Sequence, residues 1–154
     1  MTEEKVGDEH GLFPRPLTER ELATLRFMLS VPDGRLDPLR SQVPFTTVVG
    51  RCPCPCASIE LSVDRSQATA AQGLGERPAV STVGQEPGNE LNTYFLMVWL
   101  DKGWLSSLEV AYIEHLPTEF PPLELFEPPK IDEPSTEESI RTRVWSTLRS
   151  RLRR

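Results

Sequence analysis

The chain has 154 residues, which corresponds to one domain large enough to bury a hydrophobic core. Apolar residues make up 38% and charged residues 26%, a composition typical of a folded protein. The longest apolar run covers seven residues, 94–100, whereas a membrane-spanning helix needs about 20. The formal charge of −6 excludes a uniformly basic nucleic-acid binder. The acidic N-terminus lacks the apolar segment of a secretion signal, so we expect a cytoplasmic protein.

Charge is distributed unevenly along the chain. Residues 141–154 contain six arginines and no acidic residue; subtracting these six charges from −6 leaves −12 over residues 1–140. Residues 114–138 carry eight acidic residues and one basic residue. A basic tail beside an acidic body favours intramolecular attraction or a solvated tail, and salt weakens that attraction beyond roughly 8 Å.

Helical patterns occupy the first third of the chain. Residues 1–16 are expected to form a loosely held lead-in. A capping-box pattern at residues 18–21 predicts the start of a helix with one apolar face, which ends before Pro32. A second short helix is expected over residues 37–43, because Pro38 suits the first helical position.

From residue 46 the spacing of apolar residues changes from helical to alternating, which predicts strands. The strictest alternation places Ile59, Leu61 and Val63 on the inward face. Residues 65–92 are expected to be a long connection in which only a short stretch is a strand. The predicted strands lie at residues 46–49, 58–63, 79–83, 94–100 and 105–113.

The run at residues 94–100 is apolar at every position, which is typical of a central strand covered on both faces. Residues 101–104 predict a tight turn, with Gly103 where a positive φ is needed. The return strand would then place three side chains on one face: Leu108, Val110 and Tyr112.

These elements predict an α+β domain over residues 17–127: an antiparallel sheet of four to five strands with the N-terminal helix packed on it. Six prolines between residues 117 and 134 favour an extended segment lying on this body, and residues 128–135 are expected to be a linker. Residues 136–154 predict a basic amphipathic helix. Its apolar positions are Ile140, Val144, Leu148 and Leu152, with Trp145 beside them.

The three cysteines lie together, at Cys52, Cys54 and Cys56, each separated from the next by a proline. Their odd number and a reducing compartment argue against structural disulfides. Three thiolates with His10 or His115 could form a tetrahedral zinc site. An extended chain would separate the outer two cysteines by about 13 Å, so only a bend between the prolines would permit a metal site. The alternative is packing of the thiols at a strand edge or in the interior.

Patterns for catalysis are sparse. The chain has no glycine-rich phosphate loop and no nucleophile elbow, and it contains two histidines. The candidate acid–base groups are the neighbours Glu114 and His115 at a strand end and, on the outer surface of the sheet, Glu60 with Glu109. Neighbours in a strand point to opposite faces, and exposed glutamates on strands are ordinary. Trp99 and Trp104 beside the turn are expected in the core. We therefore expect a protein that is not an enzyme.

The basic C-terminal helix could bind nucleic acid, an anionic membrane or a protein. The acidic body would repel phosphate, and the polar stripe of the helix leaves a slim apolar face for a membrane. A tryptophan is costly to leave in water, which favours docking on an unknown protein partner or on the chain's own domain. The residues expected to make this contact are Arg141, Trp145, Arg149, Arg151 and Arg153.

Five stretches follow one another in this order: residues 16–21, 49–56, 58–64, 101–109 and 117–121. Together they resemble, over residues 15–125, a family of small uncharacterised conserved hypothetical proteins of actinobacteria. It implies no established activity, and therefore no catalytic residue. Members usually have glycine among the cysteines where this chain has Pro53 and Pro55. The stiffer segment weakens a metal interpretation.

Two functional hypotheses follow. The first is a non-catalytic protein-interaction module of the adaptor or immunity kind, which needs no cofactor. The second is a metal-dependent or thiol-dependent regulator that uses Cys52, Cys54 and Cys56, with zinc as the candidate metal.

Overall fold

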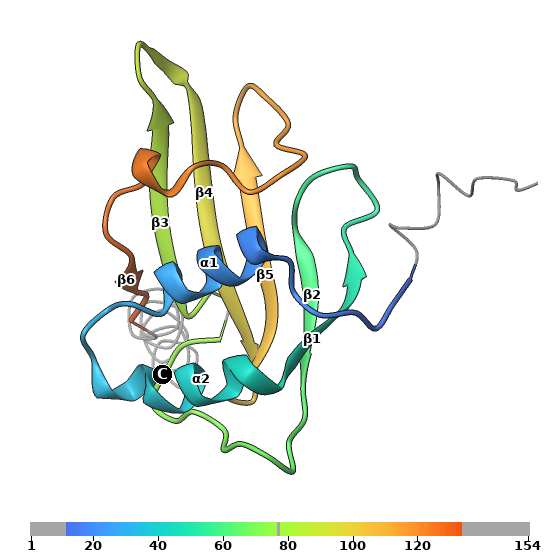
Figure 1. Cartoon of the computed structure of the whole chain (residues 1–154). Coiled ribbons are helices and arrows are strands. Elements are labelled where there is room, and N and C mark those ends of the chain that lie inside the picture. Colours follow the sequence, from blue (N-terminus) through green and yellow to red (C-terminus); the bar gives the residue numbers. More distant parts are fainter. Residues whose placement is uncertain (1–11, 77, 134–154) are drawn as a thin grey trace, which may run out of the picture.

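The computed structural model describes residues 12–76 and 78–133, and the described chain is an α+β fold (Figure 1). Its elements, in chain order, are α1 (Glu19–Met28), η2 (Gly34–Leu36), α2 (Asp37–Gln42), η3 (Val43–Phe45), β1 (Thr46–Arg51), β2 (Ile59–Val63), β3 (Val80–Glu86), β4 (Asn89–Asp101), β5 (Trp104–Tyr112), η4 (Leu123–Leu125) and β6 (Lys130–Ile131). Both helices of the first third of the chain lie where the sequence predicts them.

The strands form one open antiparallel sheet in the order β1-β2-β5-β4-β3-β6. The described residues thus contain six strands, one more than the four to five expected. The additional strand, β6, lies within the expected linker at residues 128–135 and pairs with β3 at the edge of the sheet. The sequence does not predict β6 because a strand of two residues is too short to show an alternating pattern. The prolines just before it are compatible with a strand at the edge of a sheet.

The start of α1 is built as its sequence predicts. The hydroxyl of Thr18 accepts the backbone N–H of Glu21 at 3.2 Å, and the Glu21 carboxylate accepts the backbone N–H of Thr18 at 2.8 Å. This reciprocal pair satisfies two backbone donors that the first helical turn leaves without a partner. The cap therefore fixes where the helix begins.

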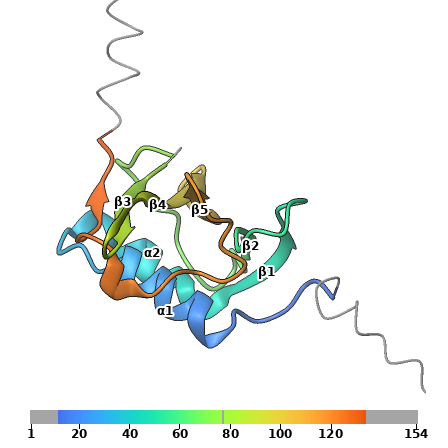
Figure 2. The same cartoon turned by 90° about the horizontal axis from the view of Figure 1, so that it is seen from above.

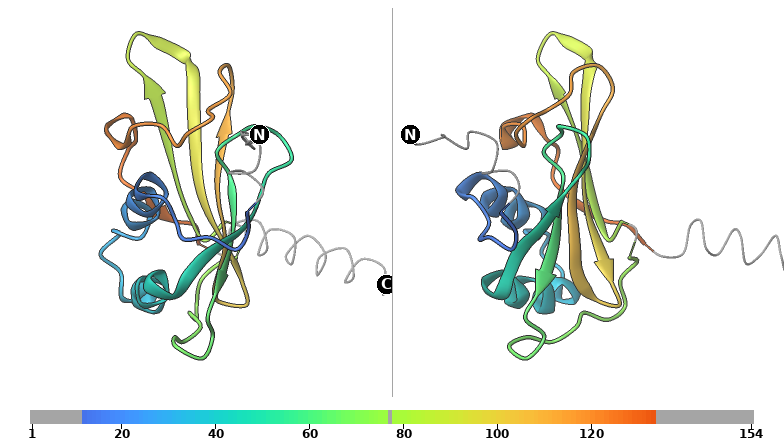
Figure 3. Two further views of the ribbon diagram at one scale, coloured as in Figure 1. Left: turned by 45° about the vertical axis from the view of Figure 1, so that its right-hand side comes forward. Right: turned by 90° about the vertical axis from the view of Figure 1, so that its right-hand side faces the viewer.

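Both helices pack on the same face of the sheet, as the views from above and from the side show (Figures 2 and 3). Leu25 and Met28 of α1 and Leu39 of α2 are fully buried against this face. The sheet contributes inward side chains from its central strands, among them Leu96, Val98 and Leu108, which are also fully buried. Each such side chain contributes about 1.5–3 kcal/mol of burial free energy, so this layer is the core.

The opposite face of the sheet carries no helix or strand of the described residues (Figure 3). On β4 the alternate side chains Met97 and Trp99 are half-buried on this outer face, and Phe95 is 38% exposed. The prediction that β4 is covered on both faces is therefore wrong for the described residues. A run that is apolar at every position shows that both faces of a strand are apolar, but it does not show that something covers each of them.

The connection before β4 is shorter than expected. β3 and β4 form a hairpin that turns at Gly88, which has a φ of +79°, so much of the expected connection at residues 65–92 belongs to strands. The polar residues around this turn hide the alternating pattern. The next turn, between β4 and β5, has the predicted positive φ at Gly103 (86°), and Lys102 also has a positive φ (50°), which the sequence does not predict.

The two ends of the chain extend beyond the described residues. Of the expected lead-in at residues 1–16, Arg15 is paired with Val48 of β1 by backbone hydrogen bonds of 3.0 and 2.8 Å. The expected basic helix at residues 136–154 and its contact residues Arg141, Trp145, Arg149, Arg151 and Arg153 lie outside the described part of the chain. Within that part, every helix is too short or too polar to cross a membrane.

Candidate metal centre

The three cysteines lie in the loop at residues 52–58 that joins β1 to β2. The backbone N–H of Cys52 donates to the carbonyl of Ser58 at 3.2 Å and closes the loop. The backbone N–H of Ala57 donates to the carbonyl of Pro117 at 2.9 Å, and the Ser58 hydroxyl accepts the backbone N–H of Val110 at 3.0 Å. These bonds tie the loop to β5 and to the segment that follows it.

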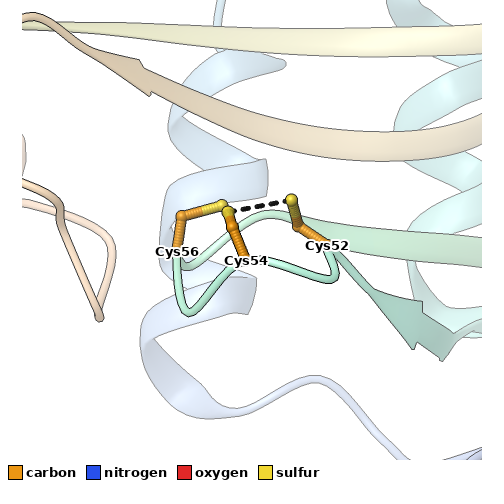
Figure 4. Close-up of side chains that lie close together, drawn as sticks. All are labelled: Cys52, Cys54 and Cys56. Atoms are coloured by element: carbon orange, nitrogen blue, oxygen red, sulfur yellow. Dashed lines mark hydrogen bonds between the residues drawn. The ribbon is translucent and has the colours of Figure 1, made fainter.

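The three thiols converge within this loop. The Sγ atoms of Cys52, Cys54 and Cys56 all lie within 4.8 Å of one another (Figure 4). Those of Cys52 and Cys54 are 3.0 Å apart. The chain bends at residues 53–57, which is the condition under which the sequence permits a metal site, so the 13 Å separation of an extended segment does not apply. Proline biases the residue before it toward extended backbone, but it still allows a bend at the next position.

Burial is graded across the cluster. Cys56 is buried with 4% exposure, Cys52 is half-buried and Cys54 is exposed. Cys52 and Cys54 line a cleft of about 1060 Å³ between the start of α1, this loop and the segment at residues 117–120. The thiol cluster therefore has one side in the protein interior and one side that small molecules can reach.

The other side chains that line this cleft are mostly charged: Arg15, Glu19, Arg20, Glu21, Arg51 and Glu119. Arg20 of α1 donates to the carbonyl of Phe120 at 2.7 Å and so holds the far wall of the cleft on the helix. Arg51 donates to the carbonyl of Cys56 at 3.4 Å, which places a guanidinium beside the cysteine loop.

Arg15 and Glu21 form an ion pair at the base of the cleft, with Nη1 and Oε1 2.8 Å apart. Burial alone would raise the pKa of Glu21, but hydrogen bonds from Arg15 and from the backbone of Thr18 outweigh it and hold the pKa below its usual value. The carboxylate is thus held charged, and it stabilises the entry to α1.

The structure does not bring together the other candidate groups, which are the histidines considered as metal ligands and the glutamates considered as acid–base groups. His115 is exposed and does not belong to the cysteine cluster, and His10 lies outside the described residues. Glu60 pairs in register with Ser107 rather than with Glu109. Burial raises the pKa of the half-buried Glu109, and its hydrogen bond with Ser107 opposes this.

The two tryptophans near the β4–β5 turn have different surroundings. Trp104 packs against the core, and the guanidinium of Arg65 lies 5.2 Å from the centre of its ring. Trp99 lies on the outer face, and its buried indole N–H has no hydrogen-bond partner among the described residues. The expectation of a core pair therefore fits Trp104 and is wrong for Trp99.

The cluster has the dimensions of a thiolate metal site. Zinc–sulfur bonds of about 2.3 Å in tetrahedral geometry place the sulfurs about 3.8 Å from one another. All three sulfur–sulfur distances are at most 4.8 Å and the closest pair is at 3.0 Å, so they bracket this value. Soft thiolate donors select zinc, copper(I) or iron–sulfur clusters over hard cations such as magnesium.

Comparisons with known proteins leave the family of this chain open. No protein-family model matches it, and neither the curated proteins nor the solved structures contain a significant match. The resemblance to actinobacterial proteins therefore stays a prediction.

The sequence revealed the cysteines but not the cleft around them. Arg20 and Phe120 are 100 positions apart, and their contact depends on how the segment after β5 returns to α1. No local pattern in either segment signals this contact.

Proposed function

We propose that the protein binds one zinc ion through the thiolates of Cys52, Cys54 and Cys56, and that it works as a metal-dependent or thiol-dependent regulator. The observation that carries this proposal is the convergence of the three Sγ atoms within 4.8 Å in a loop closed by backbone hydrogen bonds. Because the fold already holds the loop in this shape, metal binding would lose less conformational entropy than it would in a flexible loop.

The ligand count supports an exchangeable site rather than a closed one. Structural zinc sites have four protein ligands, whereas sites with three protein ligands keep a fourth position for water or another molecule. The described residues bring three sulfurs together, and the cluster opens into the cleft. A fourth ligand would come from water or from a molecule that enters the cleft, which suits a site that responds to its surroundings.

The charge of the surroundings also supports the proposal. Three thiolates and one Zn²⁺ carry a net charge of −1. Arg51, which contacts the cysteine loop, supplies positive charge beside it, whereas Arg15 and Arg20 of the cleft are paired with Glu21 and Glu119. One positive neighbour partly offsets the cost of holding this negative charge in a partly buried loop.

The protein-interaction module stays a second proposal, and one observation favours it. The outer face of the sheet presents Phe95, Met97 and Trp99, and neither helix packs on it. A contiguous apolar surface of this kind is typical of a binding site.

Metal analysis of the protein purified under reducing conditions, followed by zinc titration against a chromophoric chelator, tests the metal proposal. We expect one zinc per chain and protection of all three thiols from a thiol reagent. Cys54→Ser is the most informative variant, because Cys54 is exposed and its replacement leaves the core untouched. Its zinc affinity should fall at least tenfold, since one of three thiolate ligands is lost.

Thr118→Ala is the matched control, because Thr118 is exposed and lines the same cleft without offering a thiol. Its zinc affinity should equal that of the wild type. Absence of stoichiometric zinc binding, or equal affinity in Cys54→Ser and the wild type, would overturn the proposal.

A further inference from the structure

The outer face of the sheet holds a groove that the cysteine site does not explain. Its volume is about 610 Å³, and it lies over β3 and β4 beside the edge strand β6. The strand register places Phe95 between Val83 and Ala111, and the next row places Met97 between Ser81 and Glu109. The groove floor is therefore apolar along the row of Phe95 and at Met97, with Ser81 and Glu109 on either side of Met97, and it runs across three strands.

The rim of this groove is acidic. The carboxylates of Glu127, Asp132 and Glu133 line it against one cation, Lys130. One oxygen of Asp132, Oδ2, is buried and has no hydrogen-bond partner among the described residues. A buried carboxylate oxygen without a donor is costly, so a donor that reached Asp132 would stabilise the rim of the groove.

The described chain ends at this rim. Glu133 is held by Arg35, with Nη2 and Oε1 3.0 Å apart, and this ion pair fixes the point from which residues 134–154 continue. The first six of these residues can span up to about 20 Å when extended. The distance from β6 to β5 is about 14 Å, because neighbouring strands lie about 4.8 Å apart. The tail can therefore reach every part of the groove.

The composition of the tail matches both parts of the groove. Ile140, Val144 and Leu148 recur at steps of four with Trp145 beside them, which suits the apolar floor. Residues 141–154 carry six arginines and no acid, which suits the rim. A helix from residue 140 to residue 152 would be about 20 Å long, enough to cover the stretch of about 13 Å from Phe95 to Trp99.

We infer that the chain's own C-terminal segment, residues 140–152, docks as an amphipathic helix in this groove. Its apolar side chains cover Phe95 and Met97, and its arginines pair with the acidic rim that includes Asp132. The apolar run of β4 is then covered on both faces. The inference is independent of the zinc proposal, because the groove and the cysteine cleft share no lining residue. It competes with the interaction-module proposal, because it gives the face around Phe95 and Met97 to the chain's own tail instead of a protein partner.

Hydrogen–deuterium exchange of the full-length chain, read by mass spectrometry beside its molar mass in solution, tests this inference. We expect the amides of residues 140–152 to be protected at least tenfold over an unstructured chain, in a monomer. Phe95→Lys removes an apolar contact and repels the arginines, so this protection should be lost.

Val49→Lys is the matched control. Val49 is 40% exposed against 38% for Phe95, it lies on β1, and it does not line the groove. The tail should stay protected in this variant. Unchanged exchange at residues 96–100 shows that Phe95→Lys still folds, and Leu148→Lys, which leaves the sheet sequence intact, should release the tail in the same way.

Three outcomes would overturn the inference. The first is an unprotected tail in the wild type, and the second is equal tail protection in Phe95→Lys and Val49→Lys. The third is tail protection that appears only in a dimer or in the presence of another protein, which would assign the groove to an intermolecular partner.

Discussion

The Sγ atoms of Cys52 and Cys54 lie 3.0 Å apart, although a proline follows each of these cysteines. A disulfide bond of about 2.05 Å needs the two sulfurs about 1 Å closer. Cys56 is buried, whereas Cys54 is exposed to an oxidant. The pair is therefore poised to react first when the metal is absent.

We predict that diamide, which accepts two electrons and two protons, joins Cys52 to Cys54 and leaves Cys56 reduced. Mass spectrometry after alkylation should show a loss of two hydrogens and one alkylated cysteine. Cys56→Ser should still form the bridge, and Cys54→Ser cannot form it. A bridge that includes Cys56 in the wild type would contradict the geometry. Bound zinc should slow the oxidation, because it occupies the thiolates.

Zinc is also expected to stabilise the fold, because a site formed by the native loop binds the folded chain in preference to the unfolded one. At a free zinc concentration of one hundred times the Kd, the free energy of unfolding should rise by about 2.7 kcal/mol. Thermal unfolding with zinc and with EDTA measures this difference. The stabilisation should shrink as the pH falls, because protons compete with zinc for the thiolates. A triple variant of Cys52, Cys54 and Cys56 to serine should melt identically under both conditions.

Much of the fold follows from local patterns, and the remainder depends on contacts between distant segments. The capping box of α1 and the β4–β5 turn are encoded by neighbouring residues, and both lie where the sequence predicts them. β6 is two residues long and exists because β3 offers a free edge, which no local pattern reports. The convergence of the thiols does not follow from the sequence, because proline biases the residue before it toward extended backbone, whereas one bend in the loop is enough to gather the three sulfurs.

The Arg15–Glu21 ion pair should make the free energy of unfolding depend on pH. The pKa of Glu21 is lower in the folded state than its usual value of about 4.3, so its stabilising contribution is present above that value. The contribution is lost as the pH falls through the folded-state pKa. Glu21→Gln should therefore be less stable than the wild type at pH 7, and the difference should shrink at pH 3.

Urea unfolding at the two pH values measures this effect. Glu19→Gln is the control, because Glu19 is exposed on the same helical turn. A gap between Glu21→Gln and the wild type that is the same at pH 7 and pH 3 would show that the charge of Glu21 does not carry the stabilisation.

Gln42 is a buried polar residue that we expect to stabilise the fold strongly, because its side chain makes hydrogen bonds in the interior. It is fully buried, and its side-chain amide donates to the carbonyls of Thr69 and Gly103 at 2.9 and 3.0 Å. Its carbonyl oxygen accepts the backbone N–H of Leu105 at 3.0 Å. Gln42→Leu would leave these groups unpaired in the interior at about 1–3 kcal/mol each.

We expect Gln42→Leu to cost about 3 kcal/mol in total, because part of this loss is relieved by water or small shifts. The urea midpoint of unfolding measures the cost. Gln72 is exposed and lies in the connection between β2 and β3, which also contains Thr69. Gln72→Leu should change the free energy of unfolding by less than about 0.5 kcal/mol. Similar values for the two variants would show that α2 is not fastened to the β4–β5 turn through this amide.

Alanine substitutions at two glycines should distinguish the free-energy cost of a positive φ from the cost of a steric clash. Gly88 (φ +79°) and Gly103 (φ +86°) both have backbone conformations that side chains rarely adopt. A Cβ at Gly88 would meet nothing within 4 Å, whereas a Cβ at Gly103 would lie 2.2 Å from the carbonyl oxygen of Ala71. Gly88→Ala should therefore cost about 1 kcal/mol, the usual penalty of the left-handed conformation.

Gly103→Ala should cost clearly more, since the backbone of Ala71 must also move and its 2.9 Å hydrogen bond to the Gly103 carbonyl must lengthen. Amide exchange at Ala71 should rise in this variant and stay unchanged in Gly88→Ala. The difference in unfolding free energy between the two variants measures how tightly the connection before β3 is held against the β4–β5 turn. Equal costs would mean that this contact yields freely, and the turn would then be fixed by its own backbone conformation alone.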